Sequence, residues 1–103
     1  MGKNRDIESL IRLIVNTIVH EIVIKHTNRP ESKHFLSSEI AEYRSQTEKA
    51  AKKYNWNNKD KINISKKALA KIKEKLAVKY PDVIYSEPEI TKKLEQLMNN
   101  IVP

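Results

Sequence analysis

The sequence predicts a compact, all-α domain of four helices, with room for a minor two-stranded β ribbon. Gly2 is the only glycine in 103 residues, whereas the tight hairpin turns of β-rich folds usually need glycine. Apolar residues recur instead at the three- and four-residue spacing of helices that bury one face. A chain of this length forms one domain, so we expect residues 1–103 to fold as a single helical unit.

The first predicted helix covers residues 7–25, and most of its surface is apolar. Its polar residues recur every four positions, at Glu8, Arg12, Asn16 and His20. Because charged groups are costly inside a bilayer, this pattern predicts no membrane span, and we expect a cytoplasmic protein.

The apolar surface of this first helix is wider than three thin amphipathic helices easily cover. Two interpretations follow: a buried helix at the centre of a monomer, or an interface with a protein partner or a second copy. A two-fold homodimer would bury Leu13, Val23 and Ile24. Glu21 also falls within the apolar arc, where it either reaches water or meets a lysine or tyrosine from another helix.

We predict a loop over residues 26–34, because they contain a proline and the residue before a proline disfavours helix. A second helix is expected over 37–54, with Ser37 or Ser38 as its N-cap. Its first part is also typical of a helix-turn-helix-like arrangement, with a turn at 44–46. One long helix explains the same residues equally well.

Two further helices are predicted, over 65–79 and 86–99, each with a serine as its N-cap. The short segments before them, 61–64 and 83–85, are extended in character and would form the β ribbon. In the fourth helix the predicted core residues are Ile90, Leu94, Leu97 and Met98.

The positive charge of the protein is concentrated in one stretch of the chain. The whole sequence has 20 Lys and Arg against 13 Asp and Glu, and its net charge is +7. Residues 49–79 contain eleven lysines and only two acids, a local net charge of +9. Such asymmetry is typical of surfaces that bind polyanions, because lysines neutralise phosphates.

We therefore expect an interface for nucleic acid, either DNA or RNA, within residues 49–79. Trp56 could stack on an unpaired base there. The candidate binding residues are Lys49, Lys52, Lys53, Trp56, Lys59, Lys61, Lys66, Lys67 and Lys71. The alternative is that these lysines form an ordinary solvated face and that Trp56 lies in the core.

No feature of the sequence points to catalysis, to a cofactor or to a metal. The chain has no cysteine, which excludes disulfides and thiol chemistry, and it lacks the glycine-rich loops that hold phosphates. His20 and Glu21 begin a zinc-protease pattern, but Ile24 stands where that pattern needs its second histidine. We expect a protein that is not an enzyme. The alternative to nucleic-acid binding is a helical protein-interaction or assembly subunit.

Overall fold

The computed structural model contains four α-helices and no strand in the part of the chain that it describes. The described residues are 2–26, 30–53, 56–81 and 83–101. The helices are α1 (Gly2–His26), α2 (Pro30–Ala51), α3 (Asn58–Lys79) and α4 (Glu87–Ile101). The all-α class is confirmed. The β ribbon is wrong, because residues 61–64 lie within α3 and residues 83–86 form no regular structure.

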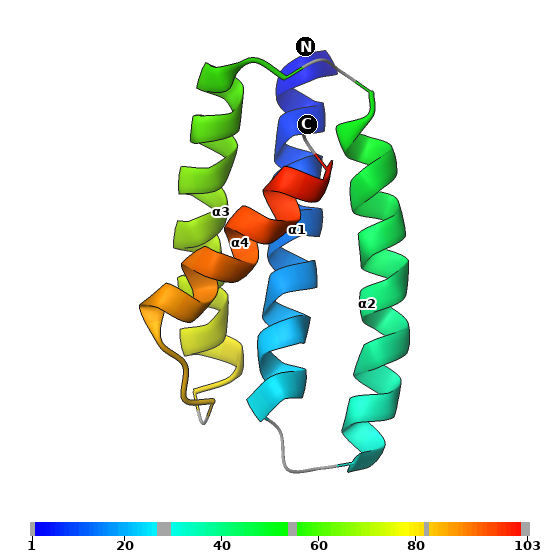
Figure 1. The fold of residues 1–103 in the computed structure, drawn as a ribbon, viewed down its shortest axis with the longest axis vertical. Helices are drawn as coiled ribbons and strands as arrows, with labels where there is room; N and C mark the ends of the chain where they lie inside the picture. The colour runs from blue at the N-terminus through cyan, green and yellow to red at the C-terminus, as the bar shows by residue number, and fades with distance from the viewer. Residues whose placement is uncertain (1, 27–29, 54–55, 82, 102–103) are drawn as a thin grey trace.

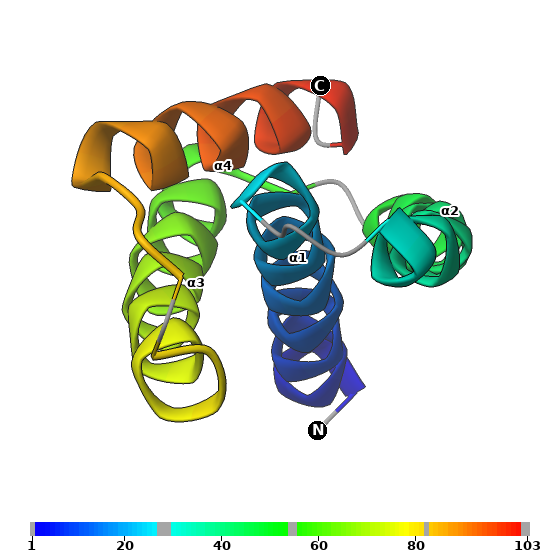
Figure 2. The same cartoon turned by 90° about the horizontal axis from the view of Figure 1, so that it is seen from below.

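The first helix, α1, lies between α2 and α3 (Figure 1). α2 runs antiparallel to α1 and α3 runs parallel to it, so α2 ends and α3 begins at the same end of the molecule. α4 lies across α1 and α3 on one face (Figure 2). α1 contacts all three other helices, whereas α2 and α3 share no contact among the described residues.

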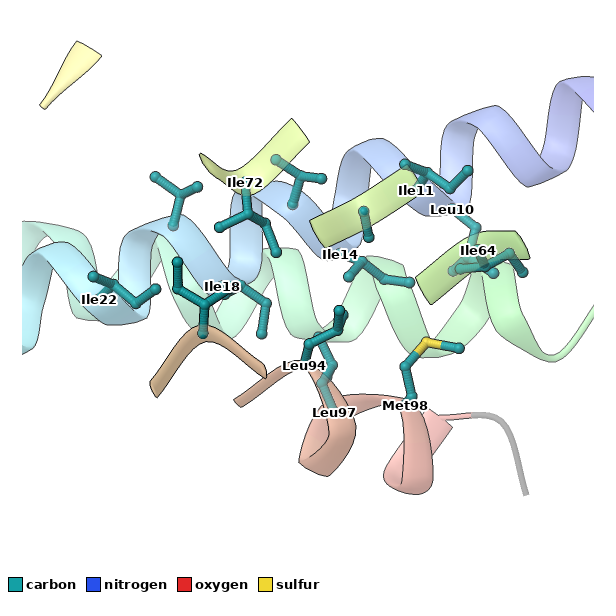
Figure 3. Close-up of a cluster of buried hydrophobic side chains, with 14 of the residues drawn as sticks. Leu10, Ile11, Ile14, Ile18, Ile22, Ile64, Ile72, Leu94, Leu97 and Met98 are labelled. Carbon is teal, nitrogen blue, oxygen red and sulfur yellow. The ribbon is translucent and has the colours of Figure 1, made fainter. Parts of the chain in front are cut away.

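The hydrophobic core is built around α1. Side chains of α3 and α4 point toward those of α1 in a continuous cluster (Figure 3). The fully buried large side chains of α1 are Leu10, Ile11, Ile14, Ile18, Val19 and Ile22. Burying one such side chain stabilises a fold by about 1.5–3 kcal/mol. The first helix is therefore central within the chain's own fold, one of the two arrangements that its apolar surface predicts.

α2 begins earlier than predicted, at Pro30, so the serine N-cap is wrong and residues 30–34 are helical instead of part of a loop. Residues 27–29 of the predicted loop lie outside the described residues. Proline suits the first turn of a helix, where its missing N–H leaves no bond unmade. The helix continues without a break through 44–46, as one long helix and without the turn of a helix-turn-helix. The buried hydroxyls of Thr17 and Thr47, 3.5 Å apart, join α1 to α2.

α3 also begins earlier than predicted, because its N-cap is Asn57 and not Ser65. The Asn57 side chain accepts a hydrogen bond of 2.7 Å from the backbone N–H of Asp60. The alternating segment 61–64 therefore belongs to the helix. The buried residues of α3 recur every four positions, at Ile64, Ala68, Ile72 and Leu76.

The start and the core face of α4 match their prediction. The helix begins directly after Ser86, whose Oγ accepts a hydrogen bond of 3.3 Å from the backbone N–H of Glu89. The Glu89 carboxylate also lies 2.8 Å from Lys25 Nζ and 2.8 Å from His26 Nε2, which joins α4 to the end of α1. The predicted core residues are all buried: Ile90, Leu94, Leu97 and Met98.

Candidate nucleic-acid interface

Lysines recur along one flank of α3 at multiples of four residues. The buried residues of α3 have the same four-residue spacing, so the two rows run side by side along the helix. One row faces the core, and the other follows its edge. We call the second row the lysine row; it consists of Lys67, Lys71, Lys75 and Lys79.

Three lysines of the lysine row, Lys71, Lys75 and Lys79, border a groove between α1 and α3. This groove has a volume of about 670 Å³. Its cations come from both helices: Arg5, Arg12, Lys71, Lys75 and Lys79. Two acids, Glu8 and Glu74, also line it, so that cations outnumber acids by five to two. We call it the cationic groove.

Glu8 lies between the lysine row and α1. Its carboxylate oxygens are 3.5 Å from Lys67 Nζ and 3.9 Å from Lys71 Nζ. All three side chains are about half exposed, and ion pairs of this kind contribute about 0–1 kcal/mol to stability. Both lysines therefore stay available to an incoming anion.

Lys75 is the most enclosed member of the lysine row. Its Nζ donates a hydrogen bond to Oδ1 of Asn16 on α1. Burial lowers the pKa of the Lys75 ammonium below its ordinary value, and the nearby charge of Lys79 lowers it further. The smaller, Lys79 part of this lowering is repulsion between like charges, which an anion in the groove would relieve.

Three of the predicted lysines belong to a different part of the surface. They lie at the end of α2 and in the turn after it, while the lysine row lies on α3, across α1 from them (Figure 1). These three are Lys49, Lys52 and Lys53. Lys53 is 3.8 Å from Asp6 of α1.

Lys61 and Lys66 occupy a third position. They line a separate hollow together with Glu95 and Met98 of α4. The lysines of residues 49–79 thus do not share one face. Of the predicted set, the structure brings together Lys67 and Lys71, which both lie within 4 Å of Glu8, and it does not bring Lys59 to them.

Trp56 lies in the core. Only 7% of the residue is exposed, and its indole N–H donates a hydrogen bond of 2.8 Å to the backbone carbonyl of Ala51. The indole therefore has little surface on which a base could stack. Tyr54, the neighbouring aromatic residue, lies outside the described residues.

The residues predicted for a dimer interface are largely covered within the chain. Val23 is buried in the core, and Leu13 and Ile24 are partly buried. Glu21, the acid in the apolar arc, is 15% exposed and meets cations from two other helices. It accepts hydrogen bonds from the Arg44 guanidinium and lies 3.9 Å from Lys93 Nζ.

Sequence reasoning missed four residues of the cationic groove. Lys75 and Lys79 extend the four-residue spacing of Lys67 and Lys71, and this periodicity would have identified them. Arg5 and Arg12 could not be assigned in the same way, because their position depends on how α1 and α3 pair.

Other kinds of site find little support. Among residues 2–26, 30–53, 56–81 and 83–101, no three His, Cys, Asp or Glu side chains are placed to hold a metal ion. No helix in that part of the chain is long and apolar enough to cross a membrane. A comparison with family models, with curated proteins and with solved structures finds no match to this chain.

Proposed function

We propose that this protein is a small basic module that binds nucleic acid in the cationic groove. One observation supports the proposal: five cations from two packed helices line a single groove with only two acids. A phosphate backbone in the groove would meet cations from α1 on one side and from α3 on the other. The neutralised phosphates would release their counterions, and this release drives binding.

The proposed site differs from the full set of lysines that the sequence suggests. It combines the lysine row with Arg5 and Arg12. Of the predicted residues it keeps Lys67 and Lys71, and it leaves out Lys49, Lys52, Lys53, Trp56, Lys59, Lys61 and Lys66. Phosphate contacts of this kind fix the position of a nucleic acid but do not distinguish its sequence. We therefore propose binding with little base specificity.

The test is fluorescence anisotropy with labelled nucleic acid at about 50 and 200 mM salt. The test variant replaces three exposed groove cations, as Arg12→Gln, Lys71→Gln and Lys79→Gln. The control replaces three exposed lysines elsewhere, as Lys49→Gln, Lys52→Gln and Lys92→Gln, with the same change in net charge. Circular dichroism melting checks that both variants fold.

The wild-type protein should lose affinity steeply as salt rises. The groove variant should bind much more weakly, and its salt dependence should fall by about 0.9 in log–log slope for each duplex phosphate that it no longer neutralises. The control variant should stay close to wild type. Equal reductions in affinity in the two variants would mean that only net charge matters, and no binding at low salt would overturn the proposal.

A further inference from the structure

The aromatic side chains whose placement the structure describes lie outside the lining of the cationic groove. Single-stranded nucleic acids are usually bound by exposed aromatic rings on which successive bases stack. Among the side chains that the structure describes, no aromatic one lines the groove. Trp56 is buried, Tyr43 packs against the ring of His20 with centroids 5.2 Å apart, and Tyr80 and Tyr85 pack against the core.

The lysine row has instead a regular and rigid geometry. Successive positions four residues apart are separated by about 6 Å along the helix axis, and the row from 67 to 79 spans about 18 Å. A duplex advances by about 3.4 Å per base pair, so a row of this length matches about five base pairs. Cations spaced along one rigid helix match best a nucleic-acid backbone whose phosphates already have a fixed geometry, as in a duplex.

One side chain of this row is fixed in place. Lys75 is held by its hydrogen bond to Asn16, so its ammonium group has a defined position before any ligand binds. Preorganised groups lose less conformational entropy on binding. This benefit is largest for a ligand whose phosphates are themselves fixed in space.

We infer that the cationic groove and the lysine row bind the phosphate backbone of double-stranded nucleic acid in preference to single strands. The inference rests on the proposed function and specifies its ligand. Recognition is by backbone phosphates alone, so duplex DNA and duplex RNA are both candidates, and the experiment separates them.

The experiment compares four labelled probes of one sequence, each about 12 nucleotides long so that it exceeds the row of about five base pairs. These are duplex DNA, duplex RNA and one single strand of each. Anisotropy titrations at about 50 mM salt give the four dissociation constants, and titrations up to about 200 mM give the salt slopes. The emission of Trp56 is recorded in the same titrations.

At least one duplex should bind about ten-fold more tightly than its single strand, a difference of about 1.4 kcal/mol. Trp56 emission should stay unchanged, since the indole is in the core. Single strands that bind as tightly as both duplexes, or a large change in Trp56 emission, would overturn this inference and leave the proposed function standing. No binding of any probe would overturn the proposed function itself.

A second readout uses the groove variant. The Arg12→Gln, Lys71→Gln and Lys79→Gln variant should lose this preference for duplex. A variant that keeps the full preference would contradict the role of the groove.

Discussion

Lys75 of α3 donates a hydrogen bond to the side-chain amide of Asn16 on α1, and this bond joins the two walls of the cationic groove. Burial lowers the pKa of Lys75, and the charge of Lys79 lowers it further. The same side chain thus contributes to the packing of two helices and to the positive potential of the groove.

Replacing Asn16 by Ala should destabilise the protein. The change removes the acceptor from a partly buried ammonium group, which should reduce the free energy of unfolding by about 1–2 kcal/mol. Urea denaturation measures this reduction. In a Lys75→Met background the same replacement should have a much smaller effect, and equal effects in the two backgrounds would show that the bond adds no stability.

Replacing Glu8 by Gln should strengthen the binding of nucleic acid. Glu8 lies near Lys67 and Lys71, so its removal frees both lysines and reduces repulsion of phosphates. Anisotropy at about 50 mM salt should give a several-fold lower dissociation constant. The matched control is Glu48→Gln on the exposed side of α2, which makes the same charge change away from the groove. An equal gain in the control would locate the effect in net charge alone.

The loss of folding stability at acidic pH should depend on Glu89. Hydrogen bonds from Lys25 and His26 hold the pKa of the Glu89 carboxyl below its usual value. Because the folded-state pKa is lower than the unfolded one, the carboxylate stabilises the fold above about pH 4.3, the ordinary pKa of glutamate. This contribution is lost as the pH falls through the lower folded-state pKa.

Glu89→Gln should therefore reduce stability at neutral pH and flatten its fall between about pH 5 and pH 3, as followed by thermal melting. The control is Glu87→Gln. Lys73 also lowers the pKa of Glu87, but the Glu87 side chain is more exposed than that of Glu89, so we expect a smaller change. If the stability of Glu89→Gln falls as steeply as that of the wild type between about pH 5 and pH 3, the prediction is wrong.

Replacing Trp56 by Phe should affect stability and leave binding intact. The change creates unfilled core volume and removes the hydrogen bond to the Ala51 carbonyl, which together should lower the free energy of unfolding by about 1–3 kcal/mol. Chemical denaturation followed by circular dichroism measures this. A folded Trp56→Phe variant with greatly weakened binding would argue for a stacking role of the indole.

The sequence determines some helix starts better than others. α4 begins at its predicted position because one serine cap precedes a short apolar pattern. The predicted start of α3 is too late, because several residues between 55 and 65 can serve as an N-cap, and Lys61 to Ile64 alternate like a strand. The packing of Ile64 against α1 decides in favour of helix, and such tertiary contacts cannot be derived from local pattern.

The same distinction applies to the candidate site. The four-residue spacing of the lysines is visible in the sequence, so one wall of the groove can be predicted from it. The second wall cannot, because Arg5 and Arg12 join it only through the parallel pairing of α1 with α3. Conversely, the cluster of Lys49, Lys52 and Lys53 is close in sequence to the lysine row but lies at the end of a different helix.

The central position of α1 has a consequence for synthesis on the ribosome. This helix is made before any of the three helices that cover it, and α2 and α3 cannot shield each other's apolar faces because they share no contact within the described residues. The nascent chain therefore exposes an isoleucine-rich segment until α3 and α4 have emerged. Such exposed segments are prone to aggregate, and chaperones bind them. The yield of folded protein should accordingly respond more to chaperone supply than its equilibrium stability alone would suggest.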